Sequence, residues 1–247
     1  MLKLLKHDIR DSFLEVVILN GALLLSSVIM FLGLVGNLFF LFGLGSLIWG
    51  VLLMAIGFVI LRVIIKSFHS KLFTNVGYLT LTTPVSIDKV LISKIIVSML
   101  WSLVTIVCVL ASYLILFGAF EILIDYGFMG EFFVNALRMM FVENFLITIE
   151  VSIAVLTSIL ASIVMLLFVL TLVNTGRMKA FKFLKAIAIF IGLTIIMYIF
   201  MYVFSSVIAR ILIDRLWIFA INIFNMLWTV GFYLLSRLLI VKRLELE

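Results

Sequence analysis

The chain has 247 residues, of which 66% are hydrophobic and 12% charged, and its mean hydropathy is +1.44. A soluble domain carries about 45–50% apolar and about 25% charged residues, so this composition excludes a soluble catalytic domain and indicates a membrane protein. The formal net charge of +6 is tested first against membrane topology, because basic residues concentrate on the cytoplasmic side of membrane proteins.

Residues 1–13 are expected to form a short amphipathic helix on the inner membrane surface. One helical face is apolar and the other is charged: Leu2, Leu5, Ile9 and Phe13 against Lys3, Lys6, Arg10 and Asp11. The apolar face would enter the headgroup region, and the basic side chains would face anionic lipid.

Six apolar runs follow, each long enough to cross a bilayer, which takes about 20 residues. They do not alternate in polarity as barrel strands do. The predicted fold is therefore an all-α bundle in one membrane domain, residues 1–247. The predicted spans are 14–35, 38–61, 95–117, 145–172, 186–208 and 217–240.

The basic residues predict the orientation of these spans. Fifteen of the 18 Lys and Arg residues fall at the two ends of the chain, in the 62–94 segment or between the fourth and fifth spans. The positive-inside rule then places both termini and these two segments in the cytoplasm of a multi-pass protein. The charge is thus a topology signal, and no nucleic-acid partner is expected.

Two connecting segments are longer than the others. The 118–144 segment is predicted to be extracellular, either as an amphipathic piece in the outer interface or as a solvated loop. The 62–94 segment is predicted to be a structured cytoplasmic loop. Its only proline, Pro84, disfavours helix at the preceding residue, and Ser86 with Asp88 suits a new helix starting near Ile87.

Polar residues inside the spans need an explanation, because a charge at mid-bilayer costs about 2.5–3.5 kcal/mol on insertion scales. Glu150 is followed at four-residue steps by Ala154, Ser158 and Ser162, which form a small, polar face on the fourth span. This face is interpreted as a helix–helix contact or as the wall of a substrate path, or Glu150 snorkels to the outer interface. Asn222 and Asn225 share one face of the last span and suit interhelical hydrogen bonds.

The sequence lacks the motifs that nucleotide binding, nucleophilic catalysis and zinc-dependent hydrolysis usually require. The sequence has no G-x-x-x-x-G-K-[ST] motif, no nucleophile elbow and no H-E-x-x-H. His7 and His69 fall outside the predicted spans, and neither sits at metal-ligand spacing with Cys, His or carboxylate residues. No catalytic residue, metal site or cofactor on this chain is expected, and an enzyme is disfavoured.

The stretch "LFTNVGYLTLTTPVSIDKVLISKIIVSMLW" resembles the cytoplasmic loop of permease subunits of bacterial ATP-binding-cassette (ABC) transporters of the type-2 exporter family. The matching motifs are Gly77-Tyr78-Leu79-Thr80, Pro84-Val85-Ser86 and Ser93-Lys94. The six spans and the tail "VKRLELE" fit more loosely. The family often has an acidic residue before the Gly-Tyr pair, able to pair with the ATPase, where this chain has Val76.

The resemblance implies a coupling helix before Pro84 that docks on a cytoplasmic ABC ATPase, which would hold the ATP and Mg²⁺. It assigns this contact to Phe73, Val76, Gly77, Tyr78, Leu79, Leu81 and Pro84. A second permease subunit, identical or different, and a second ATPase would complete the transporter in the cytoplasmic membrane. The apolar, aromatic-rich spans favour an amphipathic, lipid-like or peptide substrate.

Two alternatives stay open at the level of the sequence. The chain could be a stand-alone ion-coupled carrier in which Glu150 binds the ion. It could also be the substrate-binding membrane subunit of a vitamin importer, which would retain a small ligand.

Overall fold

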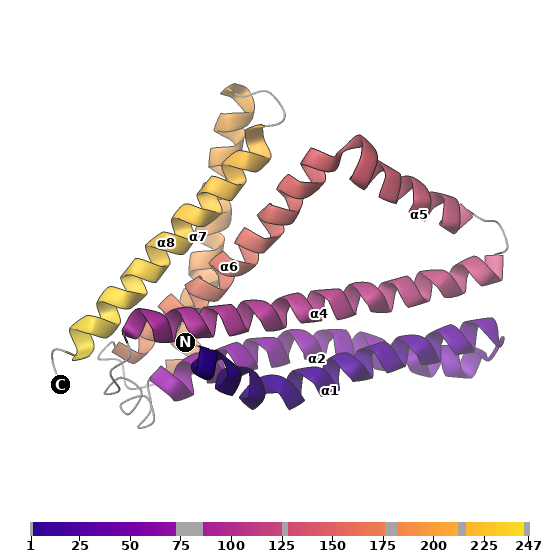
Figure 1. Cartoon of the computed structure of the whole chain (residues 1–247), viewed down its shortest axis with the longest axis horizontal. Helices are drawn as coiled ribbons and strands as arrows, with labels where there is room; N and C mark the ends of the chain where they lie inside the picture. The colour runs from indigo at the N-terminus through magenta and orange to yellow at the C-terminus, as the bar shows by residue number, and fades with distance from the viewer. Residues whose placement is uncertain (1, 73–85, 125–127, 176–181, 212–215, 245–247) are drawn as a thin grey trace. The chain divides into compact units, whose positions relative to one another are not determined.

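The six predicted spans are helical in a computed structural model of the chain (Figure 1). The structure describes residues 2–72, 86–124, 128–175, 182–211 and 216–244. Within these ranges there are α-helices and one π-helical segment, and no strand. The elements are α1 (Leu2–Val35), α2 (Phe39–Leu72), α4 (Ile87–Ile124), α5 (Phe128–Arg138), η1 (Met139–Glu143), α6 (Phe145–Thr175), α7 (Lys182–Ile211) and α8 (Leu216–Leu244).

Six of these helices, α1, α2, α4, α6, α7 and α8, are long and apolar enough to cross a membrane. The prediction of a helical, multi-pass membrane protein is thus confirmed. Helices suit these apolar runs because each helix pairs its own backbone N–H and C=O groups, whereas lipid tails offer those groups no hydrogen-bond partner.

The helices extend beyond the predicted spans at several ends. The separate helix expected over residues 1–13 is continuous with the first span, since α1 runs unbroken from Leu2. Leu5 and Ile9 pack against a core made by Val16, Val63, Val97 and Trp101. Their apolar face is therefore engaged by the protein itself, and this packing continues the helix through the predicted boundary.

The 118–144 segment, predicted to be extracellular, was expected to be either an amphipathic piece in the interface or a solvated loop. Its described residues are helical, with α4 continuing to Ile124, then α5 and then η1. Glu131, Asn135 and Arg138 recur at i, i+4 and i+7 along α5 and are exposed, so they form one polar face of this helix. This pattern favours the amphipathic alternative for that part of the segment.

The described chain divides into two compact units. The N-terminal unit comprises residues 2–64 and 97–145, and the C-terminal unit comprises residues 65–96 and 146–247. Helices α2 and α4 each contribute residues to both units.

In the N-terminal unit, α1 ends in a Schellman turn that leads directly into α2. The N–H groups of Asn37 and Leu38 donate to the carbonyls of Leu34 and Gly33, at 3.2 and 2.8 Å. Asn37 has a φ of 54°, the left-handed conformation that this turn requires and that asparagine tolerates. This turn occupies the two-residue interval between the predicted spans 14–35 and 38–61.

Polar contacts between apolar helices hold the N-terminal unit together. Trp101 of α4 donates its indole N–H to the hydroxyl of Ser12 on α1 at 2.8 Å. Further along the same helix pair, the Asn20 amide donates to the Thr105 hydroxyl at 3.2 Å. Trp49 of α2 donates to the Ser112 hydroxyl of α4 at 3.4 Å. These bonds fix which faces of α1, α2 and α4 meet, because apolar packing alone does not distinguish protein from lipid.

In the C-terminal unit, aromatic rings join α8 to both α6 and α7. Phe232 of α8 stacks on Phe168 of α6, with ring centroids 5.2 Å apart. Phe224, also of α8, stacks on Phe204 of α7 at 5.4 Å. Trp228 lies between the two α8 phenylalanines and contacts both. This row of rings positions the helices that form the site described next.

Candidate functional site

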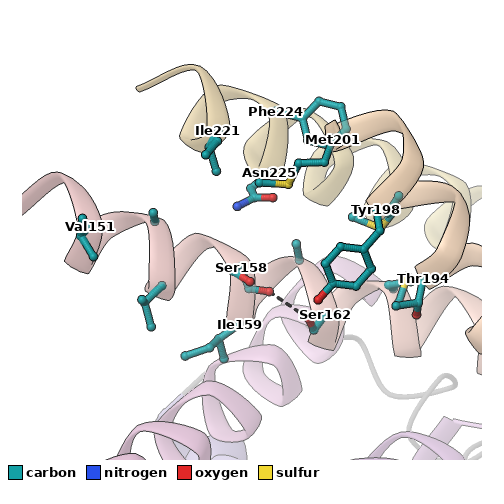
Figure 2. Close-up of a pocket in the computed structure, with 15 residues that line it drawn as sticks. Val151, Ser158, Ile159, Ser162, Thr194, Tyr198, Met201, Ile221, Phe224 and Asn225 are labelled. Carbon is teal, nitrogen blue, oxygen red and sulfur yellow. Dashed lines mark hydrogen bonds between the residues drawn. The ribbon is translucent and has the colours of Figure 1, made fainter. Parts of the chain in front are cut away.

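A cavity of about 410 Å³ lies among α6, α7 and α8, entirely within the C-terminal unit (Figure 2). The wall from α6 is the small, polar face identified in the sequence. Ala154, Ser158 and Ser162 line it at four-residue steps, and Ala161 and Met165 continue it. Small side chains on one helix face leave room that bulky leucines and isoleucines would fill.

Only some of the residues predicted for a substrate path or helix contact lie in the cavity wall. Ala154, Ser158, Ser162 and Asn225 line the cavity together, whereas Glu150 and Asn222 are not part of its wall. The two interpretations of the small face, packing and cavity wall, therefore apply to different residues of the same helix pair.

Asn222 links α6 to α8. Its side-chain oxygen accepts a hydrogen bond from the Thr157 hydroxyl at 3.1 Å, and its amide nitrogen donates to the backbone carbonyl of Glu150 at 3.4 Å. Asn222 and Thr157 are both buried. These bonds hold α6 against α8 near the cavity, and Glu150 takes part in them through its backbone.

Asn225, one turn further along α8, has a different environment. It is 6% exposed, and its side-chain amide makes no hydrogen bond to any other residue that the structure describes. Figure 2 shows the amide group of Asn225 directed into the space between α8 and α6. A buried amide without a partner costs about 1–3 kcal/mol by mutational data, so this group is suited to meet a ligand or water in the cavity.

The third wall comes from α7 and was missed in the sequence. Thr194, Met197, Tyr198 and Met201 line the cavity. They recur at i, i+3, i+4 and i+7, the spacing of one helical face. This spacing was visible in the sequence, but candidate residues were chosen by polarity, which selected positions on α6 and α8. Three of the four α7 positions are methionine or tyrosine and were therefore not selected. In Figure 2 the hydroxyl end of Tyr198 is directed toward Ser162 of α6.

A second polar group lies at the start of α4, also within the C-terminal unit. The helix begins at Ile87, as predicted, and the Ser86 carbonyl accepts from the N–H groups of Lys89 and Val90 at 2.9 and 3.4 Å. Asp88 lies in the first turn, where its charge suits the helix dipole.

The Asp88 carboxylate is also tied to α8. Its Oδ1 atom accepts a hydrogen bond from the Tyr233 hydroxyl at 2.9 Å and pairs with Arg237 Nε at 2.9 Å. Tyr233 and Arg237 are one turn apart on α8 and so present their side chains to the same side. We call Asp88, Tyr233 and Arg237 the α4–α8 clamp.

The remaining predicted site residues lie outside the described residues. They are the residues assigned to ATPase contact by the resemblance: Phe73, Val76, Gly77, Tyr78, Leu79, Leu81 and Pro84. The structure describes the chain on both sides of them, ending at Leu72 and resuming at Ser86.

One group of potential metal ligands occurs among the described residues, although none was expected around His7. His7, Asp8 and Asp11 place ligand atoms within 4.8 Å of one another, and His7 Nδ1 lies 3.4 Å from Asp11 Oδ2. The proximity follows from their i, i+1 and i+4 spacing on α1. Because His7 and Asp11 are exposed and helical spacing alone produces such groups, we assign no metal site here.

Comparison of the chain with protein-family models, with curated proteins and with solved structures finds no match.

Proposed function

We propose that the chain is the membrane-spanning permease subunit of an ABC transporter of the type-2 exporter kind. The observation that carries the proposal is the polar segment between the second and third spans, with Gly77-Tyr78-Leu79-Thr80 followed by Pro84-Val85-Ser86. Two features of the described residues support it: six helices are long and apolar enough to cross a membrane, and a helix begins at Ile87, shortly after that segment in the sequence.

The α4–α8 clamp supplies a route from the segment to the cavity. A partner that moves the segment would move the first turn of α4, and with it Asp88. Because Asp88 holds Tyr233 and Arg237, α8 would move as well. Asn225 is eight residues before Tyr233 on the same helix, about 12 Å away at 1.5 Å per residue. Force at the segment would thereby reach a residue of the cavity wall.

The chain would not hydrolyse ATP itself. Its sequence has no P-loop motif, so the ATP and Mg²⁺ would be bound by a separate cytoplasmic ATPase subunit. The complete transporter would contain two permease subunits, identical or different, and two ATPases. The role of this chain is transport, and no catalytic residue or cofactor is assigned to it.

The proposed setting is the cytoplasmic membrane of a bacterium, with both termini and the coupling segment on the cytoplasmic side. The distribution of Lys and Arg supports this orientation through the positive-inside rule. The cargo class that fits the apolar, aromatic-rich helices is amphipathic, either lipid-like or peptide.

The experiment is co-purification of the tagged chain from membranes of its natural host. We expect a P-loop ATPase in a 1:1 ratio with the chain, and we expect Tyr78→Ala to reduce its recovery at least tenfold. Tyr202→Ala is the matched control, because Tyr202 is an exposed tyrosine inside α7, and it should recover the ATPase fully. A chain that never carries an ATPase, and whose transport is abolished by Glu150→Gln, would instead be an ion-coupled carrier.

A further inference from the structure

The cavity among α6, α7 and α8 has the chemistry of a binding site. Asn225 is more than nine-tenths buried, and its amide has both a donor and an acceptor left unused by the described residues. In a membrane-spanning helix an amide of this kind is costly unless something in the cavity completes its hydrogen bonds. The Asn225 amide is therefore free to hydrogen-bond to a ligand in the cavity.

Two hydroxyl groups stand near the same space. Ser158 lines the wall opposite α8, and its hydroxyl makes no hydrogen bond to the described residues, whereas Ser162 donates to the Ser158 backbone carbonyl at 2.9 Å. The Tyr198 hydroxyl is likewise unengaged by described residues. The polar end of the cavity therefore offers one amide and two hydroxyls to a ligand.

No charged residue is among the fifteen that line the cavity. A charged ligand group would lose its hydration without gaining an ion pair, which is strongly unfavourable in a low-dielectric site. A neutral group that both donates and accepts hydrogen bonds matches Asn225, because a side-chain amide does both.

The rest of the lining is apolar and adaptable. Met165, Met197 and Met201 present flexible thioethers, and Phe224 adds an aromatic face. The volume of about 410 Å³ falls in the range of about 300–1,000 Å³ that is typical of small-molecule sites. Tyr198, at 72% exposed, and the exposed Ser158 and Ser162 mark the open side of the cavity, which lies within the membrane-spanning length of α6 and α7.

We propose that this cavity binds a neutral amphiphile, with an uncharged hydrogen-bonding head on Asn225 and Ser158 and an apolar body against the three methionines and Phe224. The inference goes beyond the proposed function, because binding to the isolated chain requires no ATPase.

The test uses the full chain in phosphatidylcholine nanodiscs and a photoactivatable, diazirine-bearing decanamide as the probe. Irradiation should label α6 and α7 peptides around residues 151–165 and 194–201 saturably, and unlabelled decanamide should compete. Asn225→Leu replaces the buried amide and should raise the probe concentration needed for half-saturation about tenfold. This is the loss of affinity expected when the ligand head loses its hydrogen bonds.

Controls separate the amide from general packing. Asn174→Leu alters an asparagine of α6 that already donates to the Leu170 carbonyl and does not line the cavity, so binding should be unchanged. Ala154→Phe, which fills the cavity from α6, should abolish saturable labelling even if Asn225→Leu proves unstable. A diazirine-bearing decanoate, with its charged head, should bind at least tenfold more weakly than the amide.

Three results would overturn the proposal. They are equal half-saturation in the original chain and Asn225→Leu, equal binding of decanoate and decanamide, and labelling spread without saturation over all lipid-facing helices.

Discussion

Replacing Tyr233 by Phe removes one oxygen atom from the α4–α8 clamp and leaves the ring in place. The Tyr233 hydroxyl donates its hydrogen to Asp88 Oδ1 at 2.9 Å, and the same carboxylate oxygen pairs with Arg237 Nε at 2.9 Å. The variant therefore isolates one of two bonds that tie the start of α4 to α8.

The magnitude follows from the charge and exposure of the partners. A hydrogen bond to a charged group contributes about 1.5–3 kcal/mol when water is excluded. The side chain of Asp88 is 38% exposed and that of Arg237 is 49% exposed, so water competes for the carboxylate. We expect Tyr233→Phe to cost about 1 kcal/mol, and Arg237→Leu, which breaks a half-exposed ion pair, to cost about 0.5 kcal/mol.

The assay is thermal unfolding of the purified chain in detergent, combined with a double-mutant cycle. For a chain of this length, 1 kcal/mol corresponds to a Tm shift of about 2–4 °C. Tyr233→Phe should lower Tm by that amount in the original chain and by almost nothing in an Asp88→Ala background.

The matched control is Tyr113→Phe, because the Tyr113 hydroxyl donates to no described residue and only its ring contacts Trp49. It should leave Tm unchanged. If Tyr233→Phe shifts Tm equally with and without the Asp88 carboxylate, the clamp does not join the two helices and the reasoning is wrong.

Three further predictions concern the N-terminal unit and the topology. Thr105→Val should lower Tm by about 2–4 °C, because it removes one of the two acceptors of the buried Asn20 amide and leaves only the Val16 carbonyl. Asn20→Leu should cost less, since it also removes the Asn20 Oδ1 atom that has no partner among the described residues. Gly33→Ala should destabilise the chain by about 1–3 kcal/mol, because the added Cβ would lie 2.6 Å from the backbone nitrogen of Phe42, whereas Gly50→Ala, with open space around it, should be neutral or slightly stabilising in unfolding measurements. In a Cys108→Ala background, a single cysteine placed at either terminus should react with a membrane-impermeant maleimide only after the cells are permeabilised; reaction in intact cells would reverse the predicted orientation.

The sequence was sufficient to predict the helical spans, because each apolar run has the length that a helix needs to cross the hydrocarbon core of a bilayer. The turn at Asn37 and the start of α4 at Ile87 were also predictable, since each depends on residues that are close neighbours in the chain. The continuity of residues 1–13 with the first span was not predictable, for the opposite reason. Leu5 and Ile9 pack against a cluster that includes Val63 and Trp101, which are distant in sequence.

The same distinction applies to the candidate site. The small face of α6 could be found from Ala154, Ser158 and Ser162, which are four residues apart. The clamp could not, because Tyr233 and Asp88 are 145 residues apart and nothing in either segment specifies the partner. Polarity marked Asn222 and Asn225 equally, and only the packing separates the one that links helices from the one that faces the cavity.

The central claim is that this chain works on ATP hydrolysed by a partner, and ATP hydrolysis by the complex purified through the chain tests it most directly. The account predicts that material from the natural host, in nanodiscs, hydrolyses ATP. It also predicts that deleting residues 72–82 removes this activity while the chain stays in the membrane at its normal level. A chain that purifies without any ATP hydrolysis, whether nucleotide is present or absent during purification, would contradict the account.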